Sequence, residues 1–179
     1  MGLKVRGLKG MYRYLTFGLL TLLISISMAV TAYSGQFEDA DAAYERGDYA
    51  TAYRLFKPMA QQGHAESQYN LGGMYAEGRG VPQDYGEATK WFRKAAEQGN
   101  AMAQYNLGGM YFRGQGVPRD FVLAHMWFNL SVSRVPASEG EKREATEIII
   151  ALVASKMTSF QIAEAQRLAR EWKPKKEER

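Results

Sequence analysis

The chain repeats itself with a period of 36 residues. The run Gln-Tyr-Asn-Leu-Gly-Gly-Met-Tyr occupies residues 68–75 and recurs without change at residues 104–111. The match continues as far as a Trp-Phe pair, found at residues 91–92 and again at 127–128. A fixed period of this length is typical of stacked supersecondary units that bury their apolar faces only against their neighbours. The sequence therefore predicts a repeat protein that presents a surface, not an enzyme.

Each unit reads as a helix, a glycine-rich turn and a second helix. In the second unit, Leu71 and Tyr75 lie one helical turn apart on one face. Gly72 costs that helix roughly 1 kcal/mol relative to alanine, so we expect another stretch of backbone to approach it closely. The Gly-Arg-Gly-Val-Pro run at residues 78–82 ends the helix, and Asp84 is placed to cap the next one.

The second helix of each unit has a predicted apolar face. In the second unit this face holds Ala88, Trp91, Phe92 and Ala95, and Gly99 is expected to end the helix in a left-handed cap. In the third unit Asp120 is the predicted cap and the inner face holds Ala124, Trp127, Phe128 and Ser131.

These units resemble the Sel1-like repeat. The residues that carry the resemblance are Ala101-Met102-Ala103-Gln104-Tyr105-Asn106-Leu107-Gly108, Tyr111, Gly114, Gly116-Val117, Asp120, Ala124 and Trp127. The first unit lacks the Gly-Val-Pro insertion and is more similar to a tetratricopeptide repeat. The resemblance covers roughly residues 38–133. It implies an all-α, right-handed α-solenoid of helix-turn-helix repeats whose members usually act as adaptors and scaffolds, often exported ones in bacteria.

The expected organisation follows the repeats. It comprises a signal peptide (1–32), a short first repeat (37–64), two Sel1-like repeats (65–100 and 101–136), C-terminal capping helices (137–172) and a disordered charged tail (173–179).

The N-terminal segment is typical of a secretory signal. Four basic residues precede an apolar run at residues 15–30, and small residues end at Ala32, where we expect cleavage, with Ser34 as the second choice. An uncleaved membrane anchor is the alternative, because the run is near the lower length that spans a bilayer. Without the four basic residues, 23 Lys and Arg against 19 Asp and Glu become 19 against 19, so the apparent basicity is no sign of nucleic-acid binding.

Two further helices follow the repeats. Ser138 with Glu141, and Thr158 with Gln161, have the spacing of a capping box. The apolar face of the first helix is predicted to hold Ala145, Ile148, Ile149, Leu152 and Met157, and that of the second Ile162, Ala165, Ala169 and Trp172. These helices are expected to cap the solenoid; docking of the last helix onto a partner is the alternative.

The sequence holds no recognisable catalytic or metal-binding constellation. It has no cysteine and only two histidines, so neither a thiol–imidazole pair nor a usual zinc cluster can be built. His64 is expected to face solvent in a turn between units, and His125 to lie at a surface or edge. Some cysteine-rich relatives in the family have been linked to β-lactams, but this chain lacks Ser-x-x-Lys and Lys-Thr-Gly elements. We expect no cofactor and no metal.

A partner-binding face is predicted on the first helices of the units, which line the concave side of such solenoids. Tyrosine, phenylalanine and arginine dominate interface energetics. The candidate binding residues are Glu66, Tyr69, Asn70, Glu77, Met102, Tyr105, Asn106, Phe112 and Arg113. We expect Tyr69 and Tyr105 to form an aromatic ladder rimmed by Glu77 and Arg113, unless both tyrosines pack between units.

The predicted function is that of an exported, periplasmic or extracellular adaptor for a protein or peptide partner. Two alternatives stay open: a membrane-anchored scaffold, and a peptidoglycan-associated auxiliary factor. A β-lactam-hydrolysing relative is a remote third.

Overall fold

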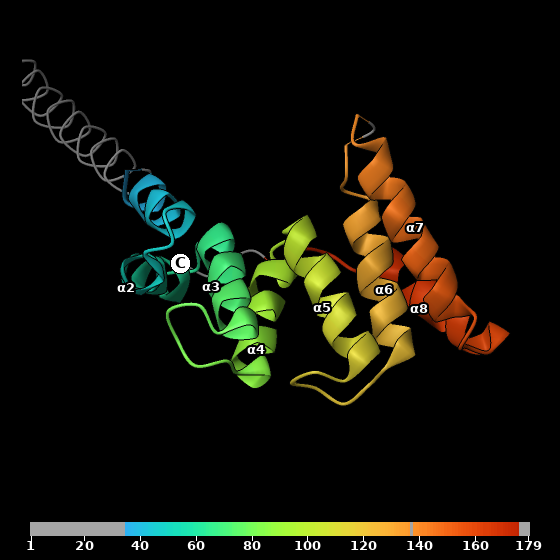
Figure 1. Cartoon of the computed structure of the whole chain (residues 1–179). Helices are drawn as coiled ribbons and strands as arrows, with labels where there is room; N and C mark the ends of the chain where they lie inside the picture. Colours follow the sequence, from blue (N-terminus) through green and yellow to red (C-terminus); the bar gives the residue numbers. More distant parts are fainter. Residues whose placement is uncertain (1–34, 137, 176–179) are drawn as a thin grey trace, which may run out of the picture. The chain divides into compact units, whose positions relative to one another are not determined.

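A computed structural model describes residues 35–136 and 138–175 of the 179-residue chain. The chain divides into two compact parts, an N-terminal part (1–39) and a C-terminal part (40–179). Residues 35–45 are helical. No strand occurs in the described ranges, and all the labelled helices belong to the C-terminal part. They are α2 (Tyr49–Gln61), α3 (Ala65–Glu77), α4 (Tyr85–Glu97), α5 (Ala101–Arg113), α6 (Phe121–Val132), α7 (Gly140–Ala154) and α8 (Ser159–Glu171) (Figure 1).

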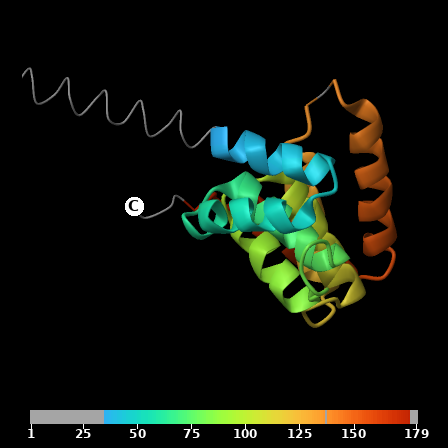
Figure 2. The same ribbon diagram turned by 60° about the vertical axis from the view of Figure 1, so that its left-hand side comes forward.

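The helices of the C-terminal part stack as successive hairpins. The helix pairs α3–α4 and α5–α6 pack within their hairpins, while α2–α3 and α4–α5 join each hairpin to the next. Figure 1 shows the hairpins following one another in chain order, with α7 and α8 at the far end beside α6. Figure 2 shows α7 at the outer edge of the stack. The all-α repeat stack expected from the period is confirmed.

Polar side chains fix where the helices begin. Asp84 accepts hydrogen bonds from the backbone N–H of Gly86 and Glu87, and Asp120 accepts one from that of Leu123, as predicted. His64 does not simply face solvent. It caps α3, because its imidazole accepts from the backbone N–H of Ser67 at 3.3 Å, as Asn100 does for α5.

Gly72 is required by the packing of an aromatic ring. A Cβ at this position would lie 2.6 Å from Cδ1 of Phe92 on α4, far inside van der Waals contact. The prediction that another backbone segment approaches Gly72 is therefore wrong, because the close neighbour is the Phe92 side chain. The same relation recurs one unit later between Gly108 and Phe128.

The core runs through the hairpins along the predicted apolar faces, with one exception. Ala88, Phe92 and Ala95 are buried. Trp91 is only half-buried, and the ammonium of Lys94 lies 4.5 Å from its ring centroid. The prediction that Trp91 shares the inner face is wrong, although its repeat equivalent Trp127 is buried.

Buried glutamines tie neighbouring helices together. Gln68 donates to the carbonyl of Ala60 at 3.0 Å and accepts from Gln98 at 2.8 Å. Gln104, its repeat equivalent, donates to the carbonyl of Ala96, but its Oε1 has no hydrogen-bond partner within the described ranges. The reason is that Arg134 stands where the period would place a second Gln98.

Arg134 forms no hydrogen bond with Gln104 and stacks on Trp172. Its guanidinium lies 4.6 Å from the ring centroid of Trp172.

The capping helices differ in part from the expectation. Thr158 and Gln161 form the predicted capping box, but Ser138 does not cap α7, whose N-cap is Glu139 without a side-chain hydrogen bond. Only Thr146 and Val153 of α7 are buried. Ala145, Ile148 and Leu152, predicted to lie on the packed face, are exposed, the last two by 64% and 50%. On α8 the predicted stripe is confirmed, with Ala165 buried and its three companions half-buried.

The segment from the end of α8 to Lys175 packs against an earlier repeat, so these residues do not form a frayed tail. The rings of Trp172 and Trp127 lie 6.2 Å apart at their centroids. The backbone N–H of Lys175 donates to the carbonyl of Glu97 at 2.8 Å, and its ammonium lies 2.8 Å from the Glu97 carboxylate. The chain therefore returns from α8 to the end of α4. The predicted tail continues to 179, beyond the described residues.

The predicted signal peptide, residues 1–32, also lies outside the described residues. In the ranges that the structure describes, no helix has the length and apolar character needed to span a bilayer.

Candidate functional site

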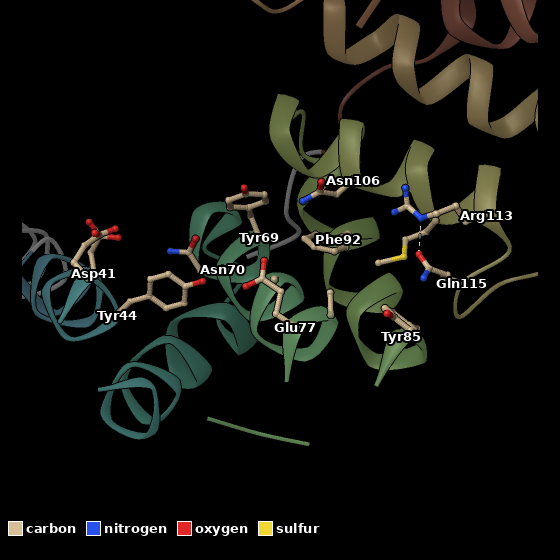
Figure 3. Close-up of a pocket in the computed structure, with 14 residues that line it drawn as sticks. Asp41, Tyr44, Tyr69, Asn70, Glu77, Tyr85, Phe92, Asn106, Arg113 and Gln115 are labelled. Carbon is tan, nitrogen blue, oxygen red and sulfur yellow. Dashed lines mark hydrogen bonds between the residues drawn. The ribbon is translucent and has the colours of Figure 1, made fainter. Parts of the chain in front are cut away.

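The main candidate site is a half-open cavity of about 510 Å³ lined by three successive repeats; we call it the repeat cavity. Helical residues 40–45 form one wall, α3 the middle and α5 the opposite wall. Figure 3 shows side chains from these elements turned towards the same space. Its lining comprises Asp41, Tyr44, Glu45, Tyr69, Asn70, Gly73, Ala76, Glu77, Tyr85, Phe92, Asn106, Met110, Arg113 and Gln115.

Because of the 36-residue period, α3 in the middle and α5 on the opposite wall present equivalent residues to the cavity. Asn70 and Asn106 are repeat equivalents, as are Glu77 and Arg113, and all four line the cavity. Because equivalent residues take equivalent places on α3 and α5, the cavity has similar polar groups on adjacent walls. The exception is charge: an acid on α3 is replaced by a base on α5.

An intramolecular cluster anchors the acidic side of the cavity. Arg79 donates to the hydroxyl of Tyr44 at 2.7 Å and lies 2.8 Å from the carboxylate of Glu77. Its guanidinium also lies over the Tyr44 ring, 5.6 Å from the centroid. Arg79 thus holds two cavity residues from successive units in fixed positions. It comes from the glycine-rich turn, so this turn positions the site as well as ending α3.

The tyrosines of this side sit in a negative environment. Burial raises the pKa of the Tyr69 hydroxyl, the nearby Tyr44 and Glu77 raise it further, and a hydrogen bond with Asn106 partly offsets the rise. Burial and Glu77 likewise raise the pKa of Tyr44, against the lowering effect of Arg79. Both phenols are therefore neutral near pH 7 and act as hydrogen-bonding groups, without acid–base chemistry.

A second cavity, the cap cavity, has a volume of about 380 Å³ and lies between α5, the end of α6 and α7. Its lining is largely apolar and includes Met102, Tyr105, Val135, Pro136 and Ala145. Glu139 and Lys142 also line it and pair with each other at 2.7 Å. Arg134 lines the cavity as well, with its guanidinium over the Trp172 ring. The cap cavity therefore offers apolar surface, one ion pair and one further basic group.

The two tyrosines of the predicted ladder line different cavities. The Tyr69 ring is 6.0 Å from Phe92 and lines the repeat cavity, while the Tyr105 ring is 5.4 Å from Phe128 and lines the cap cavity. Both are half-buried. Each packs on the second helix of its own hairpin, so they do not form a single ladder. Tyr69 also contacts the next repeat through its hydrogen bond with Asn106.

The nine predicted binding residues divide into three groups. Five line the repeat cavity: Tyr69, Asn70, Glu77, Asn106 and Arg113. Met102 and Tyr105 line the cap cavity. Glu66 and Phe112 line neither, and Phe112 instead packs on Phe121 with ring centroids 5.8 Å apart.

Sequence reasoning missed the wall formed by helical residues 40–45. Asp41, Tyr44 and Glu45 line the repeat cavity but belong to the short first unit, whose register the 36-residue period does not fix. A signal was present, because Asp41 and Glu45 are four residues apart and therefore share one helical face.

The prediction that His125 lies at a surface or edge is wrong. His125 is 3% exposed, and its Nδ1 lies 2.9 Å from Nδ2 of Asn129. Burial lowers the pKa of its imidazole. It lines neither cavity. Within the described part of the chain, no three His, Asp or Glu side chains are grouped so that they could hold a metal ion.

The model of the Sel1 repeat family matches residues 35–64, 65–100 and 101–134. The chain belongs to the Sel1 repeat family. Proteins of this family generally mediate protein–protein interactions as scaffolds and are typically not enzymes. No curated protein matches the chain.

Two solved structures resemble this Sel1 repeat protein. One is a protective antigen present in uropathogenic Escherichia coli strains, which displays an SLR fold, with a TM-score of 0.66 and 32% identity over 78% of this chain. The present chain spans only 29% of that protein. The other is a Sel1 repeat protein from Oxalobacter formigenes, with a TM-score of 0.54, 34% identity, and coverage of 63% of this chain and 88% of that one.

Proposed function

We propose that this Sel1 repeat protein is an exported, non-enzymatic adaptor that binds a protein or peptide partner on the face formed by its first helices. The observation that carries the proposal is the repeat cavity, in which three successive units contribute to one concave site. Concave sites with a few convergent polar groups are where ligands bind by default. Family membership supports partner binding as the role of this surface.

The chemistry of the cavity supports recognition without reaction. Asn70 and Asn106 can each donate to and accept from a peptide backbone, since an amide side chain carries both functions. Tyr69 adds aromatic surface beside them. The backbone that carries these groups is helical, so no loop has to be ordered when a partner binds.

Site-specific photocrosslinking in intact cells tests the binding face. A photoreactive amino acid is placed at Asn70 or Asn106 in the full chain, and at Ile148, which is 64% exposed and lines neither cavity, as the control. The proposal expects the same crosslinked species from both cavity positions and none from Ile148. Crosslinks from Ile148 alone would contradict it.

Export is tested separately. The apolar run and the small residues before Ala32 support cleavage there, so release by osmotic shock of a protein that begins at Tyr33 is expected. A membrane-bound protein that retains Met1 would instead support the anchored alternative, without affecting the binding face.

A further inference from the structure

α5 forms a wall shared by both cavities. Met102 lines the cap cavity, whereas Asn106, Met110 and Arg113 line the repeat cavity. These four residues follow one another at intervals of three or four, which places them on one stripe of the helix. A ligand that crosses this stripe of α5 therefore contacts both cavities.

The wall of the repeat cavity formed by helical residues 40–45 carries negative charge that no ion pair among the described residues neutralises. Asp41 and Glu45 are exposed, and neither forms an ion pair with any other described residue. The third acid, Glu77, is already paired with Arg79. The only basic residue that lines the cavity, Arg113, lies on the opposite wall and donates to Gln115 at 2.6 Å. A cationic group is thus favoured beside helical residues 40–45, away from Arg113.

The cap cavity selects for different chemistry. Met102 is 51% exposed there, beside Val135, Pro136 and Ala145. Glu139, the one acidic residue of the lining, is paired with Lys142, so this cavity offers no unpaired acid to a cationic group. An apolar side chain would bury this surface, at about 25 cal/mol per Å² of apolar area removed from water.

The two contacts lie at different places on the binding face, because α5 is the one helix that lines both cavities. A single ligand segment that fills both therefore has to present its two side chains at a fixed spacing.

We propose that the partner presents an extended segment with a lysine or arginine that enters the repeat cavity at Asp41 and Glu45, and an apolar side chain further along the segment that enters the cap cavity. This inference rests on the proposed binding face and adds the chemistry of the partner to it.

A peptide series tests the inference with the full-length protein. Each fluorescent peptide carries one lysine and one leucine at a varied spacing in a glycine–serine background, and binding is followed by fluorescence anisotropy. We expect one spacing to bind more tightly than the others, because the two contacts lie at fixed places on the protein. Replacement of the lysine by glutamate should weaken binding at least about tenfold.

Matched variants locate the two contacts. Asp41→Asn with Glu45→Gln should weaken the lysine–leucine peptide about tenfold, whereas Glu141→Gln with Glu144→Gln, an equal charge change on α7 at residues that line neither cavity, should have little effect. Met102→Gln should weaken binding, whereas Ile148→Gln should not. Unchanged circular dichroism melting shows that each variant is folded.

Several results would overturn the inference: no binding by any peptide, equal binding of the glutamate peptide, no dependence on spacing, or unchanged affinity in the Asp41/Glu45 variant. If crosslinking at Asn70 and Asn106 still succeeds in such a case, the binding face stands and only the basic-and-apolar partner is rejected.

Discussion

At the scale of single residues, the glycine pair Gly72-Gly73 separates two roles that the sequence alone does not distinguish. Both are helical glycines in the repeated Leu-Gly-Gly-Met run. A Cβ at Gly72 would meet the Phe92 ring at 2.6 Å, while a Cβ at Gly73 would meet nothing within 4 Å. Only the first glycine is required by packing.

Alanine at these two positions should therefore have opposite effects. Gly72→Ala should destabilise the protein by about 1–3 kcal/mol, since overpacking against Phe92 outweighs the gain in helix propensity. Gly73→Ala should stabilise it by up to about 1 kcal/mol. Urea denaturation measures both, and equal effects of the same sign would show that Phe92 moves aside.

His125 should make stability depend on pH. Its pKa in the folded protein is below the ordinary value of 6.5 because burial disfavours the charged form. At a pH below about 6.5 the unfolded chain therefore binds this proton more readily than the folded one, and stability falls as the pH falls. Above that value the contribution is complete.

The free energy of unfolding, measured at about pH 7.5 and pH 5.5, should drop by up to about 1 kcal/mol through this residue. His125→Gln should reduce the drop, and His64→Gln serves as the control. An equal drop in wild type and His125→Gln would remove His125 as its cause.

At the scale of helices, the sequence predicts where a helix begins better than it predicts which face of the helix is buried. Asp84 and Asp120 cap as expected because N-capping is a local interaction between a side chain and the next turn. The buried face of α7 could not be read in the same way. Ala145, Ile148 and Leu152 form a plausible apolar stripe, but α6 packs on the side that holds Thr146 and Val153, and that choice depends on a distant helix.

The two predicted capping boxes provide a matched test at this scale. Thr158→Ala should cost about 1 kcal/mol, because Thr158 accepts from the backbone N–H of Gln161. Ser138→Ala should cost close to nothing, because α7 has no side-chain cap. Thermal unfolding monitored by circular dichroism distinguishes them. A larger loss from the Ser138 change would contradict the structure.

At the scale of the whole C-terminal part, the 36-residue period predicted the helix stack and the candidate binding face, but not all the residues that line each cavity. Five of the nine predicted residues line the repeat cavity because equivalent positions recur on α3 and α5. The acidic wall at Asp41 and Glu45 was missed because the first unit is shorter and out of register. The cap cavity was missed because α7 is not a repeat helix, so no periodic residue indicates its position.

Trp172 should contribute to the stability of the whole stack. It lies against Trp127 and Arg134 and covers the core that α4, α5 and α6 share. Trp172→Ala should cost roughly 2 kcal/mol or more, in line with the loss of a large packed side chain. Phe160→Ala is the control, since Phe160 is 80% exposed. Equal melting temperatures for the two variants would show that α8 is not needed to cover the core.

The return of the chain from α8 to Glu97 has a mechanical consequence. A pulling force applied at Lys175 does not enter through the outermost helix alone, because its backbone N–H and ammonium are both bound to Glu97 at the end of α4. Tension is first carried by these bonds. Only after they rupture can α8 peel from α6, so the last helices in the sequence are shielded from load by a residue of the second repeat.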